Sequence, residues 1–193
     1  FERYGVILQY KQLEFAVAAR SCDDENGATE VGFGGARGPG KSFSLMSQVA
    51  LDDCQRIPGL KVLYLRKTGK KAQEQLEDLV SNVLSHFPYK DVIRGRINFA
   101  NGSRIMLGGF KDDREALSYQ GIEYDIIVIE ETTQLSEHTY KTLRLSERSS
   151  KIFDGKSWRA RTYNSTNPLG VGHQWYKKRF VDNERDKHTA DYD

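Results

Sequence analysis

A glycine-rich segment at residues 35–42, Gly-Ala-Arg-Gly-Pro-Gly-Lys-Ser, restricts the possible folds of this chain more than any other feature. It follows Thr29–Phe33, which we expect to be a short buried strand, and it precedes Lys41–Cys54, an apolar-striped segment that we expect to be a helix. The spacing matches G-x-x-x-x-G-K-[ST], in which backbone N–H groups surround phosphates. A strand, a glycine loop and a helix in this order predict a phosphate-binding loop.

The residue types in this loop suit a polyphosphate. Glycine has no side chain, so the backbone can approach an anion closely. A lysine ammonium reaches the β- and γ-phosphates, a serine hydroxyl ligates Mg²⁺, and the N-terminal end of the helix directs its dipole toward the same anion. A glycine-rich turn that precedes a lysine by chance is the alternative. The predicted nucleotide-binding residues here are Gly35, Gly38, Gly40, Lys41, Ser42 and Phe43.

Two carboxylates, Glu130 and Glu131, stand at the end of the apolar run Asp125–Ile129. We expect this run to be a central parallel strand. A buried strand ends in carboxylates where a cation compensates their charge. We therefore expect Glu130 to hold the Mg²⁺ shell and Glu131 to polarise the attacking water as general base. A solvated pair of glutamates at the start of a helix is the alternative.

Segments with helical and strand-like patterns alternate along the chain, which predicts a parallel sheet. The pattern favours an α/β fold of the P-loop NTPase class, a mainly parallel β-sheet with helices on both faces and a small β-hairpin. We expect further helices at Gln9–Arg20, Ala72–Phe87, Ser136–Arg148 and His173–Val181, further strands at Lys61–Leu65 and Ala160–Ser165, and a hairpin at Asn101-Gly102 between Ile97–Phe99 and Arg104–Leu107.

Composition and charge limit the classes of partner. The net charge of +2 is too small for a uniformly basic nucleic-acid-binding surface, so any contact with nucleic acid must use local patches. No apolar run is long enough to cross a bilayer. Cys22 and Cys54 are far apart and offer no zinc site. The acid pairs Asp52-Asp53 and Asp112-Asp113 have polar surroundings, and we interpret them as surface charge.

The order of these motifs resembles that in the large terminase subunits of tailed bacteriophages and prophages, the ATPases that package viral DNA. The resemblance spans nearly the whole chain, and the order and spacing of several segments carry it together. These segments are Leu8-Gln-Tyr-Lys-Gln12, Gly34–Ser42 with Arg37 before the mid-loop glycine, Val62–Thr68, Phe99–Leu107, Tyr119-Gln-Gly121 ahead of the two glutamates, Ser165-Thr-Asn-Pro168 and His173-Gln-Trp175.

The resemblance implies a P-loop ATPase of the additional-strand, catalytic-glutamate type and adds roles for five residues. Arg37 would stabilise the γ-phosphate in cis. Thr166 and Asn167 would register that phosphate and pass the change to the DNA-gripping surface. Gln12 would read the adenine edge, with Tyr10 packed nearby. The alternatives are an exposed helical residue for Gln12, a solvated loop residue for Arg37 and the start of a turn for Asn167.

The activity implied by the resemblance is Mg²⁺-dependent ATP hydrolysis that drives double-stranded DNA into a procapsid. The implied cofactors are ATP and Mg²⁺. The implied partners are double-stranded DNA, the portal, the small terminase subunit and further copies in a homo-oligomeric ring, in the host cytoplasm and without a membrane. Two other hypotheses stay open: an ATP-controlled ring-assembly or scaffold module with incidental hydrolysis, and a helicase-like ATPase. We interpret residues 1–181 as the ATPase domain and 182–193 as a polar tail or linker, with the family's nuclease domain outside this chain.

The chain departs from the family pattern at two positions. Terminases commonly place aspartate first in the acid pair, whereas this chain has Glu130, one methylene longer. Which of Glu130 and Glu131 holds the Mg²⁺ shell and which activates the water therefore stays open. Some relatives carry a trans-acting arginine finger where this chain has Gln120. Arg114, Arg144 and Arg148 are the candidates for an arginine supplied by a neighbouring subunit, and the sequence does not choose among them.

Three basic clusters are candidates for contacts to DNA phosphates. They are Arg66–Lys71, Trp158–Arg161 and Lys177–Arg179. Charge runs usually belong to solvated faces, which is the alternative for each cluster. We interpret Trp158 and Trp175 as packing residues and not as platforms for bases.

Overall fold

The computed structural model describes residues 1–35, 40–68, 72–85, 87, 91–93 and 95–182. Its strands form a seven-stranded sheet in the order β1-β9-β6-β2-β5-β4-β3 and a separate two-stranded hairpin, β7-β8. The strands are β1 (Glu30–Phe33), β2 (Lys61–Lys67), β3 (Asp91–Ile93), β4 (Arg96–Asn98), β5 (Arg104–Phe110), β6 (Ile126–Ile129), β7 (Ile152–Phe153), β8 (Lys156–Ser157) and β9 (Arg161–Ser165).

Helices connect most of these strands. They are α1 (Tyr10–Ser21), α2 (Lys41–Ser47), α3 (Cys54–Arg56), α4 (Ala72–Leu84), α5 (Asp113–Ala116), α6 (Glu137–Arg144) and α7 (His173–Phe180). A π-helical stretch, Gln48–Asp53, joins α2 to α3. The three elements form one continuous helical segment that covers the predicted helix Lys41–Cys54 and ends two residues later, at Arg56. Short 3₁₀ turns lie at Glu2–Tyr4, Leu117–Tyr119 and Thr132–Gln134. None of the helices in the described ranges is both long enough and apolar enough to cross a bilayer.

The five strands β1, β9, β6, β2 and β5 run parallel, and β4 and β3 continue the sheet in antiparallel directions. β9 lies between β1, which leads into the glycine loop, and β6, which ends at the two glutamates. Phe33 pairs with Ser165, and Ile129 pairs with Asn164, so the loops after all three strands leave the same edge of the sheet. The predicted α/β fold, with its additional strand, is confirmed.

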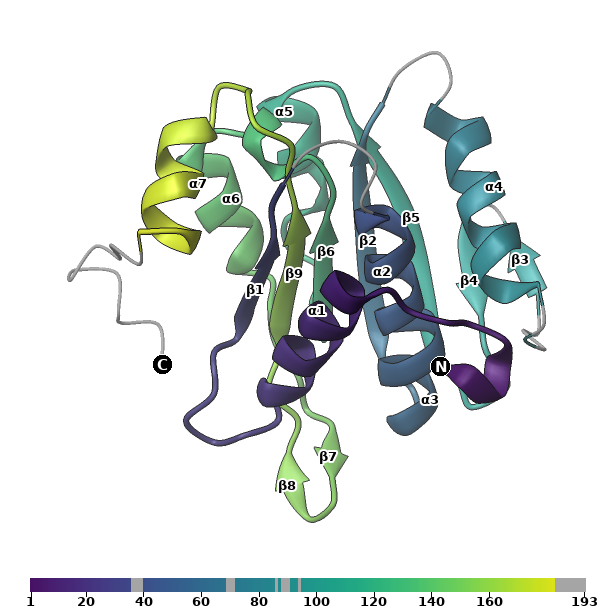
Figure 1. Ribbon diagram of the computed structural model, residues 1–193. Coiled ribbons are helices and arrows are strands. Elements are labelled where there is room, and N and C mark those ends of the chain that lie inside the picture. Colours follow the sequence, from purple (N-terminus) through teal and green to yellow (C-terminus); the bar gives the residue numbers. More distant parts are fainter. Residues whose placement is uncertain (36–39, 69–71, 86, 88–90, 94, 183–193) are drawn as a thin grey trace.

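Two apolar clusters cover the two faces of the sheet. Ile126 and Val128 of β6 face a cluster formed with α1, α2, α3 and α4, whereas Ile127 and Ile129 face a cluster formed with α5, α6 and α7. The alternation follows from the two-residue period of a strand, and a strand covered on both faces is apolar throughout. Figure 1 shows α1, α2 and α4 together on one face of the sheet. Helices therefore cover both faces, as predicted.

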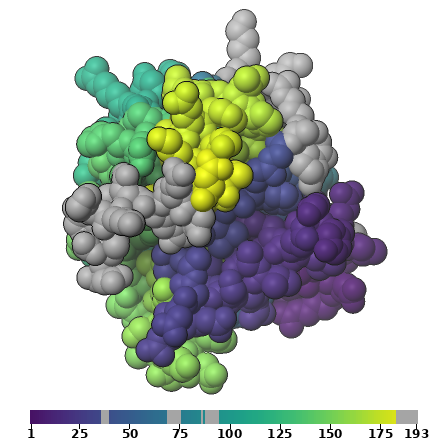
Figure 2. Space-filling view, turned by 60° about the vertical axis from the view of Figure 1, so that its left-hand side comes forward, coloured from purple at the N-terminus to yellow at the C-terminus, as the bar shows by residue number. Residues whose placement is uncertain are grey.

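Two hairpins have glycine turns. The predicted hairpin between β4 and β5 forms at Asn101-Gly102, where the N–H of Gly102 donates to the carbonyl oxygen of Phe99 at 3.1 Å. A second hairpin, β7–β8, turns at Asp154-Gly155, with positive φ at both residues. We did not predict it, although Asp-Gly is a strong hairpin signal, because its strands are too short to show alternation. It projects from the end of the molecule opposite α5 (Figures 1 and 2).

The interpretation of Trp158–Arg161 as a DNA-contacting cluster is wrong for Arg161. Arg161 is fully buried, its Nη1 lies 2.8 Å from Oδ1 of Asp23, and its guanidinium lies 3.7 Å from the centre of the Trp158 ring. Trp158 is buried in the core cluster, which confirms its packing role. A guanidinium that is stacked on an aromatic ring and paired with a carboxylate stabilises the core and cannot contact DNA.

The interpretation of Asp52-Asp53 as surface charge is also wrong for Asp53, which is fully buried. One of its oxygens, Oδ1, accepts a hydrogen bond from Arg56 at 3.1 Å. The other, Oδ2, is buried without a hydrogen-bond partner among the described residues. Burial, and then the neighbouring Asp52, raise the pKa of Asp53 to about 6.

This buried carboxyl predicts a dependence of stability on pH. The folded chain holds the Asp53 proton to a higher pH than the unfolded chain, so stability from this group is lost as the pH rises through about 6. Asp53→Asn cannot ionise, and we expect its free energy of unfolding, relative to wild type, to rise by up to roughly 3 kcal/mol between about pH 4 and pH 8. Urea unfolding across this range measures the difference. A difference that does not change with pH contradicts the prediction.

Candidate nucleotide-binding site

The glycine loop connects β1 to α2 at the edge where the parallel strands end. Gly40 is the residue before α2 and has the left-handed conformation, with φ 67°. This backbone angle favours glycine, and a Cβ atom here would lie 2.3 Å from Nε2 of Gln12 and displace the end of that flexible side chain. Gly35 also has positive φ, and a Cβ built on it meets no atom within 4 Å. Arg37 and Gly38 lie outside the described residues.

Lys41 is the first residue of α2, and its ammonium lies against the loop. Its Nζ donates a hydrogen bond to the carbonyl oxygen of Gly35 at 3.1 Å, across the span of the loop. The residue is buried, and burial lowers the pKa of its ammonium. A cation beside the start of a glycine loop, on the first residue of the following helix, is suited to a polyphosphate.

Ser42 and Glu130, 88 residues apart in sequence, meet at this edge. The Ser42 hydroxyl donates to Oε2 of Glu130 at 3.0 Å, and the glutamate side chain is buried. The backbone N–H of Glu130 continues the sheet by donating to the carbonyl oxygen of Leu65 at 2.8 Å. The end of the acid strand therefore lies against the start of the loop helix, which is the juxtaposition that the sequence predicts.

Two residues of β2 also contact the Glu130 carboxylate. The Tyr64 hydroxyl donates to Oε1, and Nε of Arg66 lies 3.5 Å from Oε2. Burial, and then the charge of Glu130, raise the pKa of Tyr64 well above its usual range, so the hydroxyl stays a neutral donor. The predicted strand Lys61–Leu65 is two residues too short: β2 extends to Lys67, so Arg66 of the basic cluster Arg66–Lys71 lies in the strand and beside the site.

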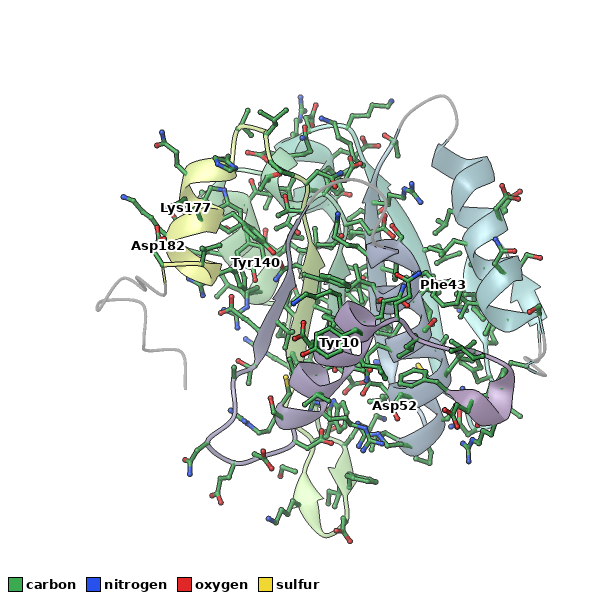
Figure 3. The ribbon with its side chains drawn as sticks, in the orientation of Figure 1. Tyr10, Phe43, Asp52, Tyr140, Lys177 and Asp182 are labelled. Atoms are coloured by element: carbon green, nitrogen blue, oxygen red, sulfur yellow. The ribbon has the colours of Figure 1, made fainter. Side chains whose placement is uncertain are left out.

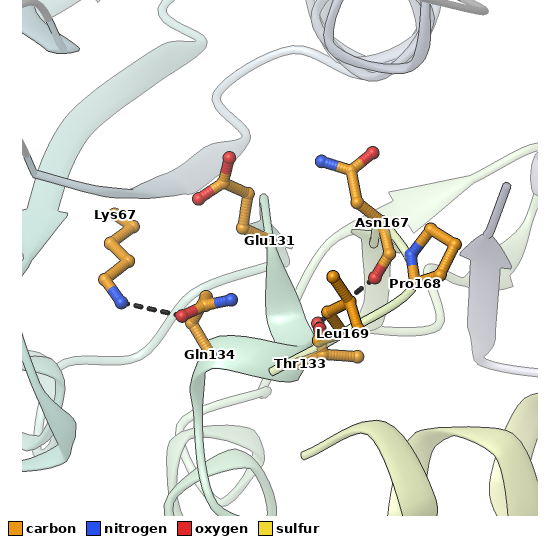
Figure 4. A pocket seen from close by; sticks show the side chains of 7 residues that line it. All are labelled: Lys67, Glu131, Thr133, Gln134, Asn167, Pro168 and Leu169. Carbon is orange, nitrogen blue, oxygen red and sulfur yellow. Dashed lines mark hydrogen bonds between the residues drawn. The ribbon is translucent and has the colours of Figure 1, made fainter. Parts of the chain in front are cut away.

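Glu131 faces an open pocket beside this group of residues. The pocket has a volume of about 430 Å³ and is lined by Lys67, Glu131, Thr133, Gln134, Asn167, Pro168 and Leu169. The side chains of Glu131 and Asn167 extend to the same side of it (Figure 4). Glu131 has φ 53° and ψ 42°, a left-handed conformation that is strained for a residue with a side chain. This turn separates the two acids: Glu130 points to Ser42, and Glu131 points to the pocket.

The loop after β9 is tied to the loop after β6 through Thr133. Its buried hydroxyl lies 2.6 Å from that of Thr166 and donates to the carbonyl oxygen of Leu169 at 2.7 Å. Leu169 has a positive φ of 103°, another strained conformation. The predicted residues Thr166 and Asn167 therefore lie beside Glu131. No sequence pattern pointed to Thr133.

The predicted adenine-reading residue, Gln12, lies against the loop. Its Oε1 accepts from the backbone N–H of Gln9 at 2.8 Å, and its Nε2 donates to the carbonyl oxygen of Gly40 at 3.3 Å. Tyr10 is exposed on α1, and Phe43 on α2 packs partly against the core (Figure 3). These contacts place Gln12 at the loop, and its role toward a base stays a prediction.

The residues at Ser42 and Glu130 fit a magnesium ion that is bound mainly through phosphate. A serine hydroxyl and a carboxylate oxygen are hard ligands, and Mg²⁺ usually combines one or two such groups with water and substrate phosphates. Within the described part of the chain, no cluster of three or more His, Cys, Asp or Glu residues could hold a metal without such phosphates. The site therefore suits an ion that arrives with a nucleotide.

The family comparison agrees with this geometry. The phage terminase large subunit family matches residues 26–193. The chain belongs to that family. No curated protein sequence matches it significantly. This terminase chain therefore carries its phosphate loop, acid pair and β9 loop inside the matched region.

Solved terminases share the fold at low sequence identity. The large terminase of a thermophilic bacteriophage aligns with a TM-score of 0.68 and 17% identity over 92% of this chain. That of bacteriophage HK97 gives 0.64 and 12% over 93%. The ATPase domain of the Thermus phage P74-26 large terminase gives 0.54 and 17% over 91%, and 72% of that domain is covered. This chain spans only 43% of the thermophilic phage protein and 38% of the HK97 protein.

Internal ion pairs occupy two arginines of this terminase chain that the sequence analysis gave as candidates, one for the arginine finger and one for DNA contacts. Glu30, at the start of β1, accepts from Arg144 and from Arg179, whose Nε lies 2.7 Å from Oε2. Arg144 also pairs with Glu147 at 3.0 Å. Arg144 is therefore unsuited to act as a finger in a neighbouring subunit, and Arg179 is unsuited to grip DNA. Arg114 and Arg148 are exposed and stay candidates for the finger.

Proposed function

We propose that this terminase chain is the ATPase domain of a DNA-packaging motor, which hydrolyses ATP with Mg²⁺ to move double-stranded DNA into a procapsid. One observation carries the proposal: the Ser42 hydroxyl lies 3.0 Å from the Glu130 carboxylate, while the next residue, Glu131, faces an open pocket. A binding site with one acid toward the metal position and another toward a space for water is suited to hydrolysis.

The bound nucleotide is ATP in this proposal. The large terminase of the thermophilic bacteriophage has been solved with ADP and with ATP-gamma-S, and the latter structure aligns with this chain at a TM-score of 0.63. The loop amides and Lys41 bind the β- and γ-phosphates, and Ser42 and Glu130 hold Mg²⁺. When bound, the ion neutralises charge on those phosphates. Gln12 reads the adenine edge, with Tyr10 and Phe43 alongside.

The reaction transfers the γ-phosphoryl group to water. Glu131 orients a water molecule in the pocket and accepts its proton as the water oxygen attacks the γ-phosphorus. The bond from that phosphorus to the bridging oxygen breaks, ADP leaves with the electron pair, and inorganic phosphate forms. Arg37 stabilises the charge on the transferring group in cis. Lys41 and the loop amides hold the leaving group.

The loss of the γ-phosphate is relayed through the loop after β9. Asn167 and Thr166 sense the phosphate from beside Glu131. Thr133 links them to the strained Leu169, because its hydroxyl contacts both Thr166 and the Leu169 carbonyl oxygen. The next element is α7, where the Tyr176 hydroxyl donates to Asn164 of β9 at 2.6 Å. A change at Asn167 can therefore move a helix that contacts the same strand.

DNA, the portal, the small terminase subunit and further copies in a ring are the proposed partners. We expect linear double-stranded DNA to raise the steady-state ATPase rate of the 193-residue chain at least several-fold, because a motor couples turnover to its track. The alternative scaffold role predicts that ATP changes the oligomeric state while DNA leaves turnover unchanged. Phosphate release with and without DNA, in parallel with light scattering with and without ATP, separates the two. Turnover that DNA does not alter contradicts the motor.

A further inference from the structure

Two side chains of β2 contact the carboxylate of Glu130, the proposed Mg²⁺ ligand. Tyr64 and Arg66 lie two residues apart on β2, so they project from the same face, and β2 is the direct neighbour of β6. Tyr64 is fully buried, and its hydroxyl donates to Oε1 of Glu130. The same hydroxyl lies 3.4 Å from the backbone carbonyl oxygen of Ser42. Tyr64 therefore contacts both residues of the predicted metal site.

The two oxygens of Glu130 have different neighbours. Oε1 is held by the tyrosine, whereas Oε2 accepts from Ser42 at 3.0 Å and lies 3.5 Å from Nε of Arg66. A glutamate has one more rotatable bond than an aspartate, so its carboxylate can turn away from a metal unless another group fixes it. The tyrosine hydrogen bond fixes this torsion and leaves Oε2 directed at the serine.

We propose that Tyr64 is a positioning residue for the Mg²⁺–nucleotide complex, acting through Glu130; this inference rests on the proposed function. Its hydroxyl holds Oε1, so that Oε2 is presented beside Ser42 before the metal arrives. Arg66 compensates the charge of the buried carboxylate in the same arrangement. A partner that orients a metal-binding carboxylate typically contributes about 10–100-fold to metal affinity. β2 thus supplies the donor that fixes the additional rotatable bond of Glu130.

The test measures nucleotide binding and not turnover. The affinity of the chain for a fluorescent ATPγS analogue is measured with excess Mg²⁺ and again with EDTA, and the ratio of the two dissociation constants gives the gain due to the metal. We expect Tyr64→Phe to leave the EDTA affinity unchanged and to lower the metal-dependent gain about tenfold. A tyrosine that only packs in the core would lower both affinities together or neither, which would overturn the proposal.

Two further variants complete the test. Tyr124→Phe removes the hydroxyl of another buried tyrosine, which precedes the start of β6, at the end of the strand away from Glu130. The Tyr124 hydroxyl has no hydrogen-bond partner among the described residues. This variant should keep the wild-type gain. Glu130→Asp shortens the side chain and withdraws its carboxylate from the tyrosine. Adding Tyr64→Phe to this variant should therefore lower the metal-dependent gain in affinity by less than about twofold. An equal loss in both backgrounds overturns the positioning role, whereas a wild-type chain without any metal-dependent gain overturns the proposed function itself.

Discussion

The Glu131→Gln variant is expected to bind ATP with nearly wild-type affinity and to hydrolyse it about 10²–10⁴-fold more slowly. Glutamine keeps the size of the side chain but cannot accept a proton. Glu131 faces the pocket beside Asn167 and makes none of the contacts that hold Ser42 and Glu130 together. Single-turnover hydrolysis gives the rate, and equilibrium binding of ATP gives the affinity.

Glu123→Gln is the matched control, since this exposed glutamate lies before the other end of β6, with its carboxylate 3.6 Å from Arg148. It should leave both quantities unchanged. If Glu131→Gln hydrolyses ATP at the wild-type rate, Glu131 is not the general base. A loss of binding in Glu131→Gln, with hydrolysis of bound ATP unaffected, would instead assign the residue to the metal or the phosphates.

The Lys41→Ala variant is expected to lose turnover by at least about 10²–10³-fold and to bind ATP much more weakly. The ammonium is buried and lies 3.1 Å from the Gly35 carbonyl oxygen, and an alanine at this position offers no charge to a phosphate. Burial lowers the pKa of the Lys41 ammonium, so folding disfavours its charged form. Replacing Lys41 in the nucleotide-free chain should therefore change the melting temperature by only a few degrees. ATPase assays and thermal unfolding measure the two effects.

Lys156→Ala, on the exposed β7–β8 hairpin, is the control for a general loss of positive charge and should keep full activity. A Lys41→Ala chain that still turns over ATP near the wild-type rate would remove the phosphate loop from the mechanism. A chain that instead fails to fold would show that Lys41 serves the structure and would leave its electrostatic role without support.

The sequence was informative where function depends on residues that are close together in the chain. The loop Gly35–Ser42 and the acids after Ile129 each stand at the end of an apolar strand, and parallel strands end at one edge. Their approach could therefore be predicted without coordinates. The separate directions of Glu130 and Glu131 could not, because they depend on a left-handed backbone turn at Glu131.

Interactions between distant segments were hidden from the sequence. Arg66 looked like part of a basic loop, but the extra length of β2 brings it to Glu130. Arg161 and Asp53 looked like surface charge, yet both are buried where several segments meet, with Asp23 and Arg56 as their partners. A charge next to polar neighbours in sequence can still be internal when its counterion comes from another element.

A structure of this chain with Mg²⁺ and ATPγS tests the central claim most directly. We predict the ion about 2.1 Å from the Ser42 hydroxyl oxygen, with Oε2 of Glu130 in contact with the ion or its bound water and the Glu131 carboxylate beside a water near the γ-phosphorus. An ion held by Glu131, or a polyphosphate bound away from the glycine loop, would contradict the account.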